Sequence, residues 1–105
     1  MLKHAAHPGE ILKQELAEIG VTPTELARQI GVPANRVSQI VNGKHSINGD
    51  TALRLGHWFD MNPQFWMNLQ AQFDLVTADR DAGDAIKALP KAATIAAKAE
   101  RPASG

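Results

Sequence analysis

The sequence predicts an all-α fold of five short helices followed by an alanine-rich C-terminal tail. Apolar residues recur at helical spacing, whereas the alternation of apolar and polar residues that marks strands is nearly absent. Glycine, proline or asparagine interrupts the periodic segments about every dozen residues. The 105 residues, of which 44% are hydrophobic, suffice for one packed core but not for two.

Two helices are predicted in the first thirty residues. The first begins at Pro8, because proline suits the first helical position, and it stops at Gly20. The second opens at Thr22, whose side chain can cap it while Glu25 completes a capping box, and it ends at Gly31. Their apolar positions are Ile11, Leu12, Leu16, Ile19, Leu26, Ala27 and Ile30.

Three further helices are predicted in the next fifty residues. One helix follows Pro33 and ends before Gly43, and a second runs from after Asn48 to near Asp60. A third helix begins after Asn62 and Pro63, which cap it. Their apolar positions are Val37, Ile40, Val41, Ala52, Leu53, Leu55, Phe59, Phe65, Trp66, Leu69 and Phe73.

The composition changes near residue 78. Residues 79–105 contain nine alanines but only three larger aliphatic residues, Ile86, Leu89 and Ile95. We therefore divide the chain into a folded domain, residues 1–78, and a tail, residues 79–105, that is partly helical or disordered and frays at 101–105. The tail is either loosely helical in solution or docks its aliphatic side chains on a partner.

The spacing of four residues indicates a helix-turn-helix unit. Ala27 is small where two helices must approach, and Gly31 suits a sharp turn because it lacks a Cβ atom. Val37 and Ile40 then return to the core at helical spacing. The same pattern also occurs in ordinary helical hairpins, in which the polar face of the second helix is merely solvated.

The polar face of the helix after this turn is suited to reading DNA. The major groove, ~12 Å wide, admits one α-helix; Arg36 can fork to guanine, and Asn35 or Gln39 can pair with adenine. The candidates for reading base edges are Pro33, Ala34, Asn35, Arg36, Ser38 and Gln39. The candidates for phosphate contacts are Thr24, Gln29, Asn42, Lys44 and His45.

The charge distribution supports this interpretation modestly. The formal net charge is zero, but residues 28–57 hold four basic residues against one acidic residue. A local basic face on a neutral protein suits a polyanion that is held in one orientation.

Late in the fifth helix, Phe73, Leu75 and Val76 are candidates for a dimer seam.

The sequence does not predict an enzyme. The chain has no cysteine, and no cysteine or nearby carboxylate completes a metal site around His4 and His7. The glutamates of the first helix have no facing acid, base or nucleophile. We therefore expect no catalytic residue, no metal and no cofactor. No apolar run approaches the ~18 residues of a membrane span and no signal peptide is present, so we expect a soluble, cytoplasmic protein without a membrane contact.

Four segments resemble one family. They are HPGEIL at residues 7–12, NRVSQIVNGK at 35–44, DTALRL at 50–55 and PQFWMNLQ at 63–70. The chain is similar, over about residues 6–76, to the HigA-type antitoxins, a branch of the Xre/λ-repressor-like helix-turn-helix proteins. Gly49 and Gly56 stand where that family usually has a better helix former, so we expect a weaker fourth helix. Asp60 replaces a glycine, which aspartate can do because it tolerates the left-handed conformation.

The resemblance implies a five-helix, λ-repressor-like DNA-binding domain that dimerises on a palindromic operator. It also implies a partner toxin, typically a RelE-like mRNA endoribonuclease, and repression of the module's own promoter. Two alternatives stay open at this point. One is a stand-alone Xre-type repressor without a toxin, and the other is a toxin-neutralising interaction module that does not bind DNA.

Overall fold

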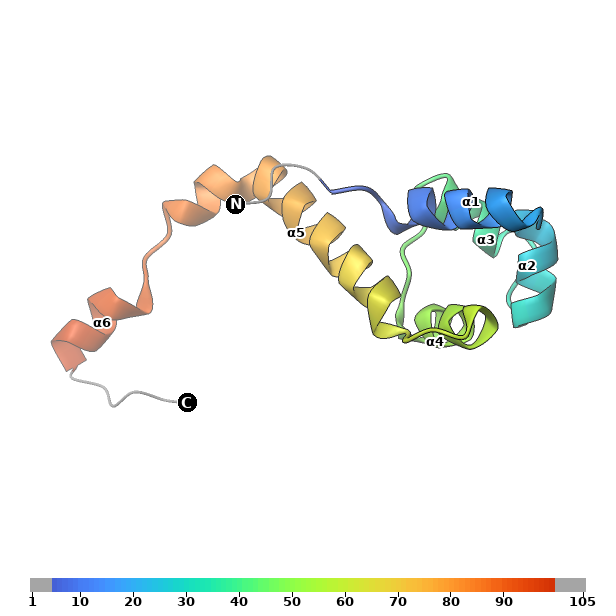
Figure 1. The fold of residues 1–105 in the computed structure, drawn as a ribbon. Coiled ribbons are helices and arrows are strands. Elements are labelled where there is room, and N and C mark those ends of the chain that lie inside the picture. Colours follow the sequence, from blue (N-terminus) through green and yellow to red (C-terminus); the bar gives the residue numbers. More distant parts are fainter. Residues whose placement is uncertain (1–4, 100–105) are drawn as a thin grey trace.

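The computed structural model describes residues 5–99, and every regular element in that range is an α-helix (Figure 1). The helices are α1 (Pro8–Ile19), α2 (Pro23–Ile30), α3 (Arg36–Val41), α4 (Gly49–Phe59), α5 (Gln64–Lys87) and α6 (Ala92–Ala99). The predicted all-α class is confirmed, and α1 to α5 correspond to the five predicted helices. The predicted fraying end at 101–105, like His4, lies outside the described residues.

The globular part consists of α1 to α4 and the first half of α5, and the rest of α5 leads away from it toward α6 (Figure 1). The molecule measures 60 × 27 × 22 Å along its three principal axes. α5 passes without a break through residue 78, where the composition changes, and it ends at Lys87, shortly before Pro90. The domain boundary at 78 therefore stays a prediction. Within the described residues, no helix combines the length and the apolar character that crossing a bilayer requires.

Side chains cap the starts of α1, α2 and α4, in α2 through Thr22 as predicted. The Gly9 N–H donates to Nδ1 of His7 at 2.9 Å, and the Glu25 N–H donates to Oγ1 of Thr22 at 3.1 Å. The Thr51 N–H likewise donates to Oδ1 of Asn48 at 2.9 Å. The capping box predicted for α2 is only half formed, because the Glu25 carboxylate binds side chains further along its own helix.

Gly31 and Asp60 each end a helix in the left-handed conformation. Gly31 has a φ of 74° at the end of α2, and Asp60 has a φ of 56° at the end of α4. A Cβ atom disfavours this region, which glycine enters freely and aspartate tolerates. The sharp turn predicted at Gly31 and the tolerance predicted for Asp60 are both confirmed.

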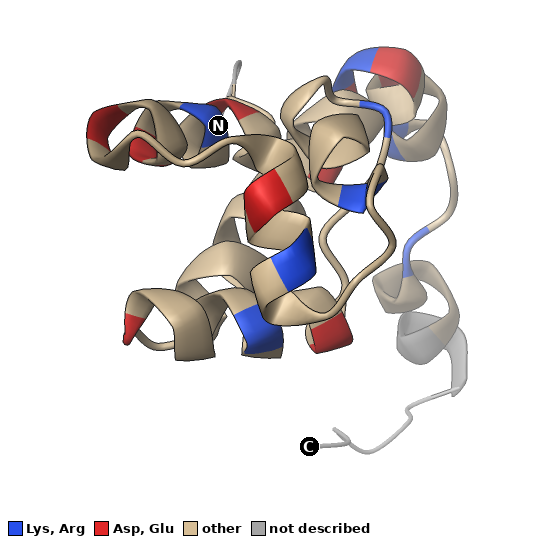
Figure 2. Ribbon diagram, turned by 90° about the vertical axis from the view of Figure 1, so that its right-hand side faces the viewer, with Lys and Arg blue, Asp and Glu red and all other residues tan. Residues whose placement is uncertain are grey.

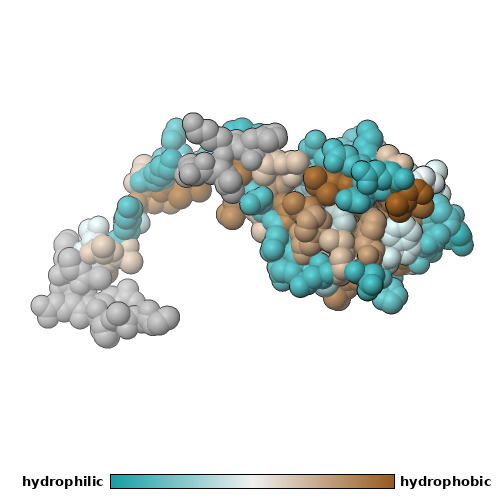
Figure 3. Space-filling view, viewed as in Figure 1, coloured by the Kyte–Doolittle hydropathy of each residue, from teal (hydrophilic) through white to brown (hydrophobic). Residues whose placement is uncertain are grey.

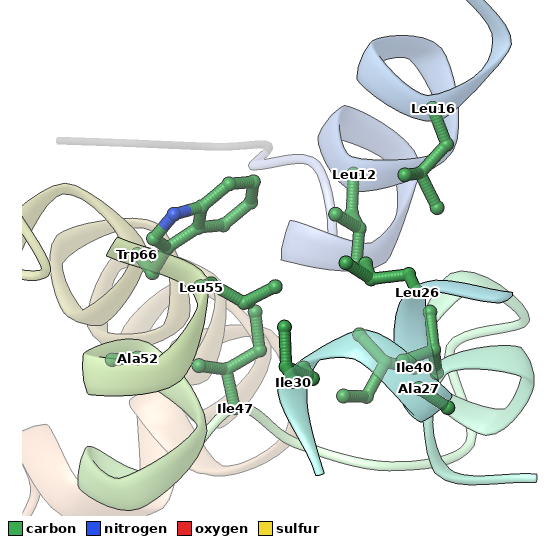
Figure 4. Packing of buried hydrophobic residues seen from close by; sticks show 11 residues of the cluster. Leu12, Leu16, Leu26, Ala27, Ile30, Ile40, Ile47, Ala52, Leu55 and Trp66 are labelled. Carbon is green, nitrogen blue, oxygen red and sulfur yellow. The ribbon is translucent and has the colours of Figure 1, made fainter. Parts of the chain in front are cut away.

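All five helices of the globular part contribute to one core (Figure 4). Its buried members are Leu12, Leu16, Leu26, Ala27, Ile30, Val37, Ile40, Ile47, Ala52, Leu55 and Trp66. Three residues predicted on core-facing positions are instead exposed, namely Ile19 at 52%, Leu53 at 64% and Phe65 at 40%. Leu53 and Phe65 each lie about 100° around the helix from a buried neighbour, and Ile19 is the last residue of α1. All three side chains therefore lie outside the buried side of their helices.

Gly56 allows a close approach and does not merely weaken α4. A Cβ atom at this position would lie 2.8 Å from the Met61 carbonyl oxygen and 3.1 Å from Cα of Pro63. The chain that connects α4 to α5 therefore packs directly on the glycine backbone. Gly49 is the first residue of α4 and has open space around it, so the expected weakness of the helix interior does not apply there.

Candidate nucleic-acid interface

The segment between α2 and α3 forms a helix-turn-helix unit. The Val32 N–H donates to the Ala27 carbonyl at 3.0 Å, and the Arg36 N–H donates to the Pro33 carbonyl at 2.9 Å. The second of these bonds closes a turn, so α3 begins at Arg36 and not directly after Pro33 as predicted. Ala27 is fully buried where α2 meets its neighbours, as its small size predicted.

The inner side of α3 fixes the direction in which its outer side points. Val37 and Ile40 are fully buried. The start of α1 packs on the last turn of α3, since a Cβ atom on Gly9 would lie 1.8 Å from the carbonyl oxygen of Ile40. The helix is therefore held from two sides, by α1 and by the core beneath it.

The six candidate reading residues lie together on the remaining side. The turn before the helix carries three exposed residues, Pro33, Ala34 and Asn35. The helix carries the other three, Arg36, Ser38 and Gln39, and these are half-buried. The candidates for base readout are therefore divided between the turn and the first part of α3, and half of them are not helical.

Four of the five candidate phosphate contacts lie at the start of α2 or directly after α3. Thr24 is exposed in the first turn of α2, and Asn42 and Lys44 are exposed just after α3. His45 is half-buried, and its Nδ1 lies 2.7 Å from the Ser46 carbonyl oxygen.

The fifth candidate, Gln29, is already engaged by other side chains. Its Oε1 accepts a hydrogen bond from Nε1 of Trp58 at 2.6 Å, and its Nε2 donates to the Glu25 carboxylate at 2.8 Å. Together with Trp58 of α4 it lines a surface pocket of about 330 Å³ between α2 and α4. The second N–H of this amide stays available to a phosphate, which would then lie close to the Glu25 carboxylate.

Two of the four basic residues of the middle third form ion pairs. Arg28 pairs with Glu25, and Arg54 pairs with Asp50 at 2.9 Å. The pKa of the Glu25 carboxyl is lowered mainly by the hydrogen bonds from Arg28 and to a smaller extent by the one from the Gln29 amide.

The other two cations of the middle third are Arg36 and Lys44. Within the described part of the chain, neither takes part in an ion pair. Figure 2 shows basic and acidic positions interspersed along the helices. The positive charge available to a polyanion is therefore smaller than the sequence count suggests.

Three residues that sequence reasoning missed position this surface. Gly9 permits the contact between α1 and α3. Nη1 of Arg54 donates to the Ile30 carbonyl at 2.8 Å, at the start of the turn. Oε1 of Gln70, which is only 4% exposed, accepts from the Ile47 N–H at 2.8 Å and ties the segment after α3 to α5. All three lie within the segments that resemble the family, but their contacts are long-range and leave no periodic signal.

The three candidate dimer residues lie in different surroundings. Leu75 is 69% exposed, whereas Val76 is 8% exposed and thus buried within its own chain. Phe73 is half-buried, with its ring edge-on to that of His7 at a centroid distance of 4.8 Å. Of the three side chains, only that of Leu75 is exposed. In residues 5–99 no group of three or more His, Asp or Glu side chains is arranged to hold a metal ion.

Comparison with known proteins identifies the class of protein that this geometry represents. The family model described as "Helix-turn-helix" matches residues 12–64, which contain α2, α3 and α4. The chain belongs to this helix-turn-helix family.

Individual similar proteins narrow the family further. Virulence-associated protein I of Dichelobacter nodosus is 41% identical over 78 residues, which cover 73% of this chain and 72% of the relative. A solved structure of the Pseudomonas aeruginosa antitoxin HigA with the higBA promoter is 43% identical, with a TM-score of 0.81 over 84% of this chain and 97% of that one. The antitoxin GraA in complex with its operator is 40% identical, with a TM-score of 0.77 over 87% and 97%. The resemblance to HigA-type antitoxins is confirmed.

Proposed function

We propose that this protein is the antitoxin of a toxin–antitoxin pair and that it represses its own promoter by binding a palindromic operator as a homodimer. The observation that carries the proposal is the polar surface of the α2–turn–α3 unit. Its six candidate reading residues face outward together because Val37 and Ile40 anchor the opposite side of α3 in the core. The relatives solved with promoter or operator DNA support it.

In this proposal each copy places α3 in the major groove of one half-site. Two copies on one face of the duplex occupy grooves ~34–36 Å apart. Arg36 reads guanine and Gln39 or Asn35 reads adenine, each good bidentate pair contributing ~1–3 kcal/mol of discrimination. Thr24, at the start of α2, and Lys44, after α3, hold the phosphates on either side and fix the register.

The toxin partner is the second part of the proposal. The similarity to proteins named as antitoxins supports a cognate toxin, and the family resemblance favours a RelE-like mRNA endoribonuclease. The exposed apolar side chains of the chain's C-terminal part, Ile86, Leu89 and Ile95, are available to such a partner, each being more than half exposed. The DNA surface and this region lie in different parts of the molecule, so both partners can bind at once (Figure 1).

A gel shift on the DNA directly upstream of the gene tests the DNA part of the proposal. We expect Arg36→Ala and Gln39→Ala each to weaken binding ~10- to 100-fold, which corresponds to the loss of one bidentate contact. Lys13→Ala is the matched control, because Lys13 is an exposed cation on α1. If both α3 variants bound the DNA as tightly as the parent, the reading surface would be wrong.

Co-expression with the adjacent small open reading frame tests the toxin part. We expect the two products to co-purify and the growth defect caused by the second product to disappear. A shifted promoter without a co-purifying partner would support a stand-alone Xre-type repressor instead. A co-purifying partner with no shift at low salt would support an interaction module that does not bind DNA.

A further inference from the structure

A buried hydrogen bond joins the chain between α3 and α4 to α5. This linking segment, residues 42–48, contains three of the candidate phosphate contacts, Asn42, Lys44 and His45. Oε1 of Gln70 accepts from the Ile47 N–H at 2.8 Å, and these two residues are only 4% and 2% exposed. Figure 3 shows hydrophobic atoms on the face of the globular part that lies beside α5. A buried N–H is costly to leave unpaired, so this bond fixes the end of the linking segment.

A second hydrogen bond orients the Gln70 amide. Its Nε2 donates to Oδ1 of Asp74, one helical turn further along α5, at 2.9 Å. A glutamine amide can present either a donor or an acceptor, and only its oxygen can accept from a backbone N–H. Because the Asp74 carboxylate binds the nitrogen, the oxygen is the atom that faces Ile47. Asp74 thus orients Gln70, and Gln70 holds the linking segment.

The linking segment is attached at both ends, and the Gln70 bond is the attachment at its far end. At the near end, the Lys44 N–H donates to the Gln39 carbonyl at 2.8 Å and ties the segment to α3. His45 and Ser46 lie between these two attachments. The path of the chain from Lys44 onward therefore depends on the bond to Gln70 as well as on α3.

The position of α3 itself does not depend on this bond. Val37 and Ile40 are fully buried and hold α3 in the core. The Ile47 side chain is a member of the same core, so it keeps the linking segment attached even when its N–H has no partner. Loss of the bond should therefore turn the segment so that water reaches the Ile47 N–H, without unfolding the domain and without moving α3.

We propose that Gln70 and Asp74 are positioning residues for DNA binding, which act through Ile47 to hold Lys44 where it meets a phosphate. The inference rests on the proposed function, because it requires the DNA to lie against α3. It deepens that function by separating two contributions. Gln70 and Asp74 support the affinity that comes from the DNA backbone, whereas the residues of α3 and its preceding turn supply the base discrimination.

Gel shifts at several salt concentrations with the full-length Gln70→Met variant test the proposal. Methionine has nearly the shape of glutamine but makes neither hydrogen bond. We expect operator binding to weaken about 10-fold and the slope of log K against log salt to fall by about 2, one phosphate contact in each half-site. The preference for the operator over a copy with one substituted base pair should stay the same. Gln64→Met is the matched control, because it removes a bond of the same i,i+4 spacing, to Asn68, on an exposed part of α5.

Two substitutions of Asp74 isolate the hydrogen bond from the charge. Asp74→Asn keeps an oxygen that accepts from Gln70, whereas Asp74→Ala does not, and both remove the carboxylate charge. We expect Asp74→Ala to bind the operator more weakly than Asp74→Asn. Hydrogen exchange of the Ile47 amide, measured without DNA, should be at least about 10-fold faster in Asp74→Ala and Gln70→Met than in Asp74→Asn and Gln64→Met. This pair carries the test if Gln70→Met does not fold.

A double-mutant cycle tests whether Gln70 acts through Lys44. In a Lys44→Ala background, Gln70→Met should weaken operator binding by less than about 2-fold, because the contact that it disturbs is already gone. Fully additive effects would overturn the inference. So would a smaller binding-competent fraction with an unchanged salt slope, which is the result of a merely structural role.

The outcomes also separate this inference from the proposed function. If the parent shifted the operator, Arg36→Ala did not, and Gln70→Met bound as the parent does, only the inference would fail. Loss of base discrimination in Gln70→Met, in step with the loss of affinity, would likewise overturn it, because α3 would then depend on Gln70. A parent protein that shifts no DNA even at low salt would overturn the DNA part of the proposed function, and this inference with it.

Discussion

Gly9 and Ile40 are in direct backbone contact, at the point where the start of α1 crosses the last turn of α3. A Cβ atom on Gly9 would lie 1.8 Å from the Ile40 carbonyl oxygen and 2.9 Å from Cα of Val41. The His7 cap fixes the same end of α1, because its Nδ1 accepts from the Gly9 N–H. Helix α3, which carries three of the candidate reading residues, thus packs on the capped start of α1.

We expect Gly9→Ala to destabilise the fold by about 1–3 kcal/mol, the usual cost of overpacking a tight contact. The methyl group must push α1 away from backbone atoms that have no freedom to yield. Gly49→Ala is the matched control, because nothing lies within 4 Å of the added Cβ atom and no positive φ is required there. Urea unfolding of both variants measures the difference, and equal stability would show that α1 and α3 do not pack as described.

We expect Arg54→Ala to loosen the turn that precedes α3. Its guanidinium donates to the Ile30 carbonyl, and this side chain also pairs with Asp50. Loss of a charge-assisted hydrogen bond to a helix C-terminus costs about 1–2 kcal/mol. Arg80→Ala removes only an exposed ion pair and should cost less than about 0.5 kcal/mol. Hydrogen exchange at the amides of Val32 and of residues 34–36 should rise in the first variant and not in the second.

We expect the salt dependence of operator binding to be shallow for a DNA-binding protein. Only two of the four cations between residues 28 and 57 make no ion pair in the described chain, Arg36 and Lys44. Each phosphate neutralised adds about −0.9 to the slope of log K against log salt. Lys44→Ala should therefore reduce the slope of a dimer by about 2, whereas Lys13→Ala should not change it. An unchanged slope for Lys44→Ala would remove this residue from the phosphate contacts.

The helix ends were predictable because they depend on local chemistry. Helices begin at Pro8, after Thr22 and after Asn48, and each start depends on groups within one to three positions. Gly31 ends α2 because its own backbone can adopt a positive φ. The start of α3 was not predictable in the same way. A proline permits either a turn or the start of a helix at this place. The hydrogen bond from the Arg36 N–H to the Pro33 carbonyl selects the turn.

The residues of the candidate site could be predicted from the sequence, but the long-range contacts around them could not. The polar positions around Arg36 follow from helical spacing, and the structure brings them to one surface. The contact between Gly9 and Ile40 joins residues far apart in the chain, so no periodicity reveals it. The engagement of Gln29 by Trp58 is equally long-range.

His7 is nearly buried, at 8% exposure, between the start of α1 and Phe73 of α5. Burial, which disfavours the charged imidazolium, lowers its pKa from the ordinary value of 6.5, and the carboxylates of Glu10 and Asp74 oppose this shift only in part. The cap adds a geometric reason, since Nδ1 must stay unprotonated to accept from the Gly9 N–H. The folded state therefore prefers neutral His7.

We expect the free energy of unfolding to fall as the pH drops below about 6.5, because the unfolded chain then binds a proton that the folded chain resists. The contribution of His7 is fully present above that pH and is lost as the pH falls through the lowered pKa of the folded state. His7→Asn keeps an N-capping side chain that does not titrate, so it should flatten the pH dependence of stability between pH 5 and pH 7. Urea unfolding across this range measures both proteins, and parallel pH profiles would show that another group is responsible. Because the capped end of α1 packs on α3, operator affinity should decline over the same interval in the parent and much less in the variant.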